Sequence, residues 1–522
     1  MAAADAYFPN YGYVGAPSNY NATEGYEDIG GDSRTENLNQ WFNAGDTGYI
    51  IIATGLVLIM VPGLAFLYSG LARRKSALSM LWAVMMSSSV ICFQWYFWGY
   101  SLALSPTATN GFIGNLDKFG LRRTLGAPSP GSPLVPELLY SIYQCMFCSV
   151  TAAIIAGSIA ERGRVIPMMV FLWVWATIVY CPLANWAWGA GGWAFNWGVM
   201  DYAGGGPVEI GSGLTALAYS MVLGRRQEKM MLNFRPHNVS LITLGTVLLW
   251  FGWLGFNGGS AFGANLRAVM ACWNTNLTAG FAAITWVLLD FRLAKKWSMV
   301  GWCSGTISGL VAATPASGFI TPWASVALGI VTGIVCNFGT KVKFWIKIDD
   351  SMDVFSEHGI AGIVGLIFNG IFGASYIIGL DGVNSADGGW VEKGWKQLYI
   401  QVAYIVAASA YTFVMSALIA FAINKIPGLQ LRATEEAELL GLDDDQLGEF
   451  AYDYVEVRRD YLAWTPAKAD PSTSESNIPQ GDRHGISQHS QMLEGRAPSD
   501  SASAEHPGDG QGIALEKVEG GH

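Results

Sequence analysis

The chain has 522 residues, of which 51% are hydrophobic and only 13% are charged. A soluble globular domain carries about 25% charged residues, so this composition excludes an ordinary soluble enzyme and indicates an integral membrane protein. The 63 glycines and 21 tryptophans agree, since glycine permits close helix packing in membranes and tryptophan is enriched at their interfaces. Much of the acid behind the net charge of −10 lies in the C-terminal tail. The charge therefore implies no basic partner for the core, and we expect no nucleic acid.

Residues 1–47 form a polar N-terminal segment. It lacks the basic and apolar regions of a cleaved signal peptide, so none is expected. Asn21-Ala-Thr is a glycosylation sequon, which is an acceptor only if this segment is extracellular. Whether Asn21 is used stays open at this stage.

Apolar stretches long enough to cross a bilayer recur through residues 48–424. They predict an all-α integral membrane domain with eleven transmembrane helices, near 48–70, 78–101, 137–160, 165–184, 203–223, 240–260, 268–290, 299–316, 320–340, 357–380 and 398–424.

The loops orient these predicted spans. The loop after the first span holds Arg73, Arg74 and Lys75, and every second loop after it is also basic. The intervening loops are poorer in lysine and arginine. By the positive-inside rule the basic loops are cytoplasmic, so an odd number of spans places the N-terminus outside and the C-terminus inside.

The tail has two predicted parts. Residues 425–464 form a cytoplasmic regulatory segment with a short helix starting at Glu435. Residues 465–522 are rich in Ser, Pro, Gly, Gln and Asp, which is typical of disorder. Their serines would suit a regulatory kinase, although any disordered tail offers serines.

Two ionisable residues lie inside predicted spans, Glu209 and His358. An ionisable group in hydrocarbon costs several kcal/mol or more unless it faces a partner or a pathway. If the spans form a five-plus-five inverted repeat, the two segments are counterparts and their polar side chains meet near the midplane. The alternatives are a protonated Glu209 that serves packing alone and a His358 satisfied by one interhelical hydrogen bond. The glycines at 359, 362 and 365 would let another helix approach closely.

Asp201 precedes the run Tyr-Ala-Gly-Gly-Gly at the start of the fifth span. A helix N-cap is the favoured interpretation, and direct substrate contact is compatible with it. Trp186 and Trp188 are expected on an outer loop, where a tryptophan face could bind a small cation. Membership of the ordinary aromatic belt is the alternative.

Other candidate sites are weak. Cys145 and Cys148 have CxxC spacing inside an apolar run with no second ligand pair, so we expect small buried hydrophobes, with no metal and no cofactor. His237 lies in a polar loop and is expected to be solvated. The absence of a P-loop, a dinucleotide fingerprint and a nucleophile elbow argues against an enzyme.

Several long motifs, in order, resemble the ammonium transporter family (Amt/Mep/Rh) over residues 45–460. They are Asp201-Tyr-Ala-Gly-Gly-Gly-Pro-Val-Glu-Ile-Gly-Ser-Gly, Gly157-Ser-Ile-Ala-Glu-Arg, Phe234-Arg-Pro-His-Asn, Gly252-Trp-Leu-Gly-Phe-Asn-Gly-Gly-Ser, Gly305-Thr-Ile-Ser-Gly-Leu-Val-Ala-Ala-Thr-Pro and Asp349-Asp-Ser-Met-Asp-Val-Phe-Ser-Glu-His-Gly.

The resemblance implies the ammonium-transporter fold, a homotrimer in the plasma membrane, and one pore per subunit. Carried over by position, it assigns Trp188, Ser260 and Asp201 to outer substrate recruitment. It assigns Phe147 and Phe256 to a stacked gate with Tyr143 beside it, and Glu209 and His358 to the pore lumen. It also implies that the tail stretch 428–454 packs against the inner pore mouth.

Position 209 departs from the usual pattern. Most family members carry histidine there, whereas this chain has glutamate, as does a subset of fungal members. The resemblance implies recruitment of NH4+ or methylammonium, loss of a proton and passage of neutral ammonia, with the Glu209–His358 pair available to relay the proton. The alternative is an ammonium sensor that signals through the cytoplasmic tail, with or without transport. An integral membrane enzyme using His358 as a base is a more distant alternative.

Overall fold

A computed structural model describes residues 38–231 and 235–452 of this chain. Within these ranges all regular structure is helical, apart from three isolated β-bridges. The sequon at Asn21 and the tail beyond residue 452 lie outside the described residues. The predicted all-α class is confirmed for the part of the chain that the structure describes.

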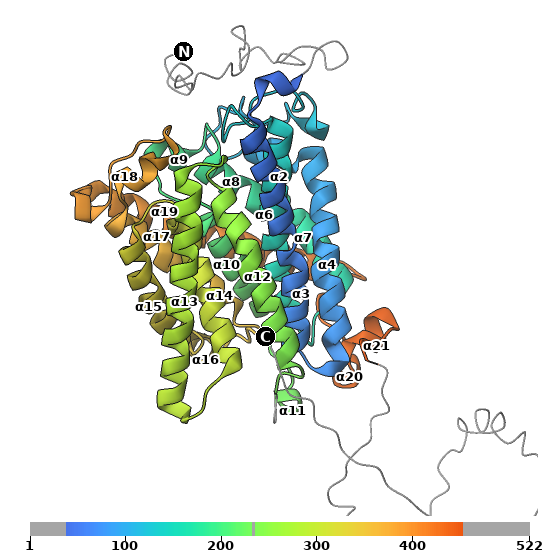
Figure 1. Ribbon diagram of the computed structural model, residues 1–522. Helices are drawn as coiled ribbons and strands as arrows, with labels where there is room; N and C mark the ends of the chain where they lie inside the picture. The colour runs from blue at the N-terminus through green and yellow to red at the C-terminus, as the bar shows by residue number, and fades with distance from the viewer. Residues whose placement is uncertain (1–37, 232–234, 453–522) are drawn as a thin grey trace, which may run out of the picture. The chain divides into compact units, whose positions relative to one another are not determined.

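The longer helices follow one another along the chain as antiparallel rods (Figure 1). The α-helices of the first half are α2 (Ala44–Leu58), α3 (Met60–Leu71), α4 (Ala77–Gln94), α5 (Tyr100–Leu104), α6 (Glu137–Ala156), α7 (Val165–Trp175), α8 (Cys181–Trp188), α9 (Trp193–Trp197), α10 (Gly211–Leu223) and α11 (Glu228–Met231). Those of the second half are α12 (Val239–Gly259), α13 (Leu266–Ala294), α14 (Met299–Ala316), α15 (Pro322–Gly339), α16 (Val342–Ile346), α17 (Ala361–Phe372), α18 (Ser375–Ile378) and α19 (Trp395–Asn424). The tail adds α20 (Glu435–Leu440) and α21 (Leu442–Leu447).

Nine helices in the described residues are long and apolar enough to span a membrane. The two other predicted spans, 203–223 and 299–316, fall on helices that do not meet this measure. Both are rich in glycine and polar residues such as Glu209 and Thr314. The chain is a multi-pass membrane protein, and the count of eleven spans stays a prediction.

Two helical segments begin with a stretch of π-helix. The first, η7 (Gly205–Ile210), leads into α10, and the second, η8 (Phe355–Ile360), leads into α17. The wider π-turn is frequent at functional sites because it shifts the side chains from their regular α-helical positions. Glu209 and His358 each lie in one of these stretches.

Glycines bring the two segments into direct backbone contact. A Cβ atom added to Gly213 on α10 would collide with the backbone of Gly359, and one added to Gly362 on α17 would lie 2.7 Å from Cβ of Glu209. Small residues are what permits such an approach between membrane helices. The close packing predicted from the glycine spacing is therefore present, and it fixes the distance between the two polar side chains.

Candidate functional site

Asp201 caps the π-helical start of its segment. Its carboxylate accepts hydrogen bonds from the backbone N–H groups of Gly204, Gly205 and Gly206 at 2.5–3.0 Å, and from the Tyr404 hydroxyl at 3.2 Å. Gly204 has φ = 114°, a conformation that residues with a side chain rarely adopt. The predicted cap is thus present. No cation pairs with this carboxylate among the described residues.

A cavity of about 330 Å³ opens above this cap. Trp188, Asp201, Ser260 and Phe147 all line it. The Trp188 indole N–H donates to the Asp201 carbonyl oxygen at 3.1 Å, which fixes the ring beside the acid. The structure therefore brings together the three residues that the resemblance assigned to recruitment.

Phe147, which lines this cavity, stacks on a second phenyl ring. The Phe147 and Phe256 ring centroids lie 3.9 Å apart at an interplanar angle of 21°, so the rings are stacked. The Tyr143 hydroxyl donates to the Phe256 carbonyl at 2.7 Å and also lies 2.9 Å from the Gly255 carbonyl. Both phenylalanines are buried, and Tyr143 fixes the backbone that carries one of them.

Glu209 and His358 form a buried pair. His358 Nδ1 lies 2.9 Å from Glu209 Oε2, and the two side chains are 4% and 0% exposed. A carboxylate beside Nδ1 favours the tautomer with the proton on that nitrogen. The second carboxylate oxygen, Oε1, has no partner in the described part of the chain. The pair predicted from the inverted repeat is therefore in contact, and one of its acceptor atoms remains available.

The profile of the Ammonium Transporter Family matches residues 48–452. The chain belongs to this family. It is 56% identical over 445 residues to the ammonium transporter MEP3 of Saccharomyces cerevisiae, covering 84% of this chain and 91% of that protein. It is 52% identical over 440 residues to ammonium transporter 2 of Schizosaccharomyces pombe, covering 83% and 86%.

Solved structures of family members have the same fold. The crystal structure of Candida albicans Mep2 matches with a TM-score of 0.76 and 46% identity, covering 82% of this chain and 94% of that one. A structure described as a sensor Amt protein matches with a TM-score of 0.70 and 27% identity, covering 77% and 98%. The predicted membership of a transporter family, as opposed to an enzyme family, is confirmed.

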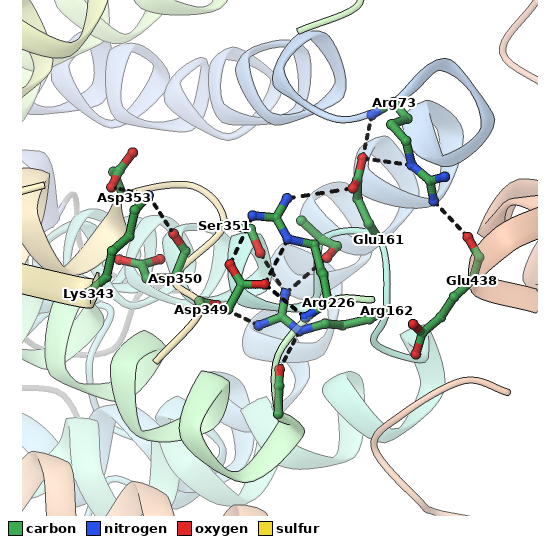
Figure 2. Close-up of polar contacts among 12 residues, drawn as sticks. Arg73, Glu161, Arg162, Arg226, Lys343, Asp349, Asp350, Ser351, Asp353 and Glu438 are labelled. Carbon is green, nitrogen blue, oxygen red and sulfur yellow. Dashed lines mark hydrogen bonds and ion pairs between the residues drawn. The ribbon is translucent and has the colours of Figure 1, made fainter. Parts of the chain in front are cut away.

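On the basic side of this ammonium-transporter fold, buried ion pairs join three loops (Figure 2). Arg226 lies between Glu161 and Asp349, with N···O distances of 3.6 and 2.9 Å. Arg162 is fully buried and donates to the Asp349 carbonyl at 2.6 Å. Burial lowers the pKa of Arg162 to about 10, so it remains charged at neutral pH.

The tail packs onto this network. Arg73 donates to the Glu438 carbonyl at 2.7 Å, and Asp443 accepts from the backbone N–H of Ser79 at 2.7 Å. Arg432 pairs with Glu438 at 2.5 Å. The short helix predicted from Glu435 is present as α20. The described part of the tail thus lies against the loops after the first and third predicted spans.

Three details differ from the sequence-based expectations. Trp186 and Trp188 end helix α8 and do not lie on a loop, because the helical chain runs past residue 184. The Trp186 indole donates to the Phe112 carbonyl at 2.9 Å, and Trp186 does not line the cavity. His237 is not simply solvated, since its ring nitrogens lie 2.9 Å from the Ala72 carbonyl and 3.1 Å from the Tyr452 hydroxyl.

Sequence reasoning missed Tyr404 and Arg267. Tyr404 is buried on α19 and bonds Asp201, so a polar group inside an apolar span was the available signal. Arg267 lines the cavity but pairs with Asp381 at 2.7 Å. Cys145 and Cys148 are buried in α6 as small side chains.

Proposed function

We propose that this chain is a plasma-membrane transporter of ammonium and methylammonium. The observation that supports the proposal is a set of groups within one helix bundle. Asp201, which forms no ion pair among the described residues, lines a cavity together with Trp188 and Phe147. Phe147 stacks on Phe256, and the Glu209–His358 pair is buried in the same bundle. MEP3, a relative at 56% identity, is described as an ammonium transporter.

Recruitment begins at the cavity. A bare cation loses hydration as it enters, and the Trp188 ring face and the Ser260 hydroxyl offset part of that loss through cation–π and hydrogen-bond contacts. Asp201 adds a negative charge whose carboxylate is held by three backbone N–H groups. These contacts select a small cation over a neutral solute.

Beyond the gate, the permeating species must change from a cation to a neutral molecule. Transfer of an ammonium ion into an apolar lumen is energetically unfavourable, whereas transfer of neutral ammonia is not. We therefore assign Phe147 and Phe256 to a gate at which the substrate gives up its proton, with Tyr143 positioning Phe256. The Glu209–His358 pair takes up that proton and relays it, while ammonia passes separately.

The glutamate at position 209 distinguishes this proposed relay from one built on two histidines. A carboxylate and an imidazole 2.9 Å apart exchange a proton as one coupled pair. Glu209 Oε1, which lacks a partner in the described residues, supplies a second acceptor in the same cluster.

Uptake of labelled methylammonium in cells that lack their own ammonium transporters tests the function. We expect saturable uptake that ammonium inhibits. Purified protein on a solid-supported membrane, given ammonium or methylammonium at several pH values, then shows whether charge moves. Absence of both uptake and current contradicts transport.

A sensor role is the second candidate. The similarity to a structure described as a sensor Amt protein favours it, as does the tail that packs against the basic loops. A pure sensor gives no uptake, so the uptake experiment separates the two. A kinase acting on the tail would modify residues beyond 452, outside the described part.

The remaining elements of the proposal follow the family. The protein assembles as a homotrimer, with the N-terminus extracellular and the C-terminus cytoplasmic, as the basic loops predict. In that orientation Asn21 is available for glycosylation. Residues 1–47 form the outer segment, 48–424 the transport domain and 425–464 the regulatory segment, and residues 465–522 complete the tail.

A further inference from the structure

A second cavity, of about 510 Å³, lies on the basic side of the helices, away from the proposed transport path. The loop after α10 and the chain around the end of α16 form it. Its charged lining consists of Arg225, Arg226, Glu228, Lys343, Lys347 and Asp349. Four cationic side chains therefore face two anionic ones, and the proposed transport function uses none of them.

One of the two anions is already neutralised. Asp349 accepts three hydrogen bonds from Arg226, one from the backbone N–H and two from the guanidinium, each at 2.9 Å. Burial raises the pKa of Asp349, but these bonds and the charges of Arg226 and Arg162 outweigh it and hold the pKa well below its usual range. Arg226 and Asp349 thus cancel within the cavity wall (Figure 2).

Two of the remaining cations have no anionic partner in the part of the chain that the structure describes. Arg225 and Lys347 are both exposed, and within residues 38–231 and 235–452 neither side chain forms an ion pair or a hydrogen bond. Lys343 is held by Asp353 at 2.7 Å and by the Asp350 carbonyl at 3.2 Å. Among the described lining residues, Glu228 alone is left to oppose Arg225 and Lys347, so this lining has an excess of positive charge.

The cavity rim carries an exposed aromatic turn. Phe344 and Trp345 on α16 are 69% and 76% exposed, and Ile346 beside them is also exposed. Lys347 then ends the helix with φ = 59°. In a membrane protein, exposed aromatic side chains at a helix end lie at the interface between hydrocarbon and water. This turn therefore places the adjacent cavity at the depth of the lipid headgroups.

We propose that this cavity binds the phosphorylated headgroup of an anionic phospholipid. A guanidinium suits a phosphate because it can donate two parallel hydrogen bonds, and a lysine adds a point charge. Basic cavities between membrane helices on the cytoplasmic side are typical binding sites for such headgroups. The aromatic rim favours a lipid over a soluble phosphate, because its acyl chains lie beside that rim. The proposal does not depend on which solute the protein transports.

Direct binding tests the proposal. The full chain, purified in detergent, is titrated with a fluorescent short-chain phosphatidylinositol phosphate. We expect saturable binding that Arg225→Gln/Lys347→Gln weakens at least about tenfold, since each basic contact is worth about fivefold. The matched control, Lys295→Gln/Lys296→Gln, removes the same charge from another basic loop and should leave the affinity unchanged. Equal weakening by both pairs, or by neither, overturns the site.

A second arm identifies the source of the phosphate. Soluble inositol phosphate and inorganic phosphate are titrated as competitors, and both should bind at least about tenfold more weakly than the lipid because they lack the acyl chains. Phe344→Ser/Trp345→Ser should weaken lipid binding and leave the soluble headgroup unaffected. A soluble headgroup that binds as tightly as the lipid overturns the lipid assignment. None of these measurements depends on transport, so they remain informative if the proposed transport function fails.

Discussion

Asp201 and Asp350 lie at the starts of the two π-helical segments that carry Glu209 and His358. Each carboxylate caps its segment: Asp201 accepts from three glycine N–H groups, and Asp350 accepts from the Phe355 N–H at 2.8 Å. Their surroundings differ. Among the described residues, Asp201 accepts hydrogen bonds only from neutral donors, whereas Asp350 lies near the charges of Lys343 and Arg162.

The same local structure, an aspartate that caps a π-helical segment, therefore serves different purposes at the two sites. At the Asp201 end the negative charge is not balanced by any described cation, so it remains available to attract a cation into the cavity. At the Asp350 end the charges are balanced within a network that ties three loops and the tail together. We therefore expect substitutions at the first end to change transport and those at the second to change stability.

The largest effect should come from a substitution in the ion-pair network at the Asp350 end, and it should be an effect on stability. Arg226→Met removes a partner of the buried Glu161 and of the partly buried Asp349, which should lower the free energy of unfolding by about 3–5 kcal/mol. Denaturation of the purified protein in detergent measures this. Arg226→Met/Asp349→Leu removes both charges and should regain most of the loss. A single substitution that costs below about 1 kcal/mol would show that this network does not stabilise the fold.

At the other end, Asp201→Asn keeps an oxygen for the cap but removes the charge. A unit charge near the substrate is worth about 3–4 kcal/mol at an effective dielectric constant of 20, so uptake should fall several hundredfold while the protein still folds. Asp350→Asn is the matched control and should change uptake less than about threefold, because nearby cations already offset Asp350. Equal losses from the two substitutions would remove the contrast between the ends.

Between the two ends, Glu209→Gln retains a hydrogen-bonding group beside His358 but cannot accept a proton. If the pair relays protons, the substrate-driven current should fall about a hundredfold and its pH dependence should change. Solid-supported membrane electrophysiology measures both. Unchanged current with an unchanged pH profile would mean that Glu209 only lines the pore.

The smallest effect on transport should come from Trp188, in the wall of the cavity beside Asp201. Trp188→Leu removes a cation–π contact worth about 1 kcal/mol, so the apparent KM for methylammonium should rise about fivefold, with little change in maximal flux. Trp186→Leu is the control, since Trp186 bonds the Phe112 carbonyl and does not line the cavity. A loss of flux as large as the loss of affinity would argue against a recruitment role.

Much of this arrangement could be predicted because the bilayer constrains the sequence directly. Spans need long apolar runs, so most helices were found, and the long motifs identified the family. Ionisable residues in those runs are rare, so Glu209 and His358 stood out without any structure. The glycines at 359 and 362 correctly indicated close packing beside them.

Helix ends and local partners were less predictable. The helical chain continues to Trp188, past the predicted end of the span at residue 184. The sequence did not predict this end because an apolar pattern does not mark where a helix stops near the interface. Tyr404 approaches Asp201 from a span 203 residues later in the chain. His237 looked solvated because nothing in its own loop reveals its contact with Tyr452.

The sequence by itself determined the membrane class, the family and the polar residues that hydrocarbon does not tolerate, since each of these follows from local composition. Only the tertiary structure decided that Glu209 Oε2 meets His358 Nδ1 and that Trp188, not Trp186, lines the cavity. It also decided that, within the described residues, Arg225 and Lys347 lack anionic partners while Arg226 has two. These facts depend on which segments pack together, and on π-turns that shift side chains from their α-helical positions. A pattern of residues along one chain contains no distances between its distant parts.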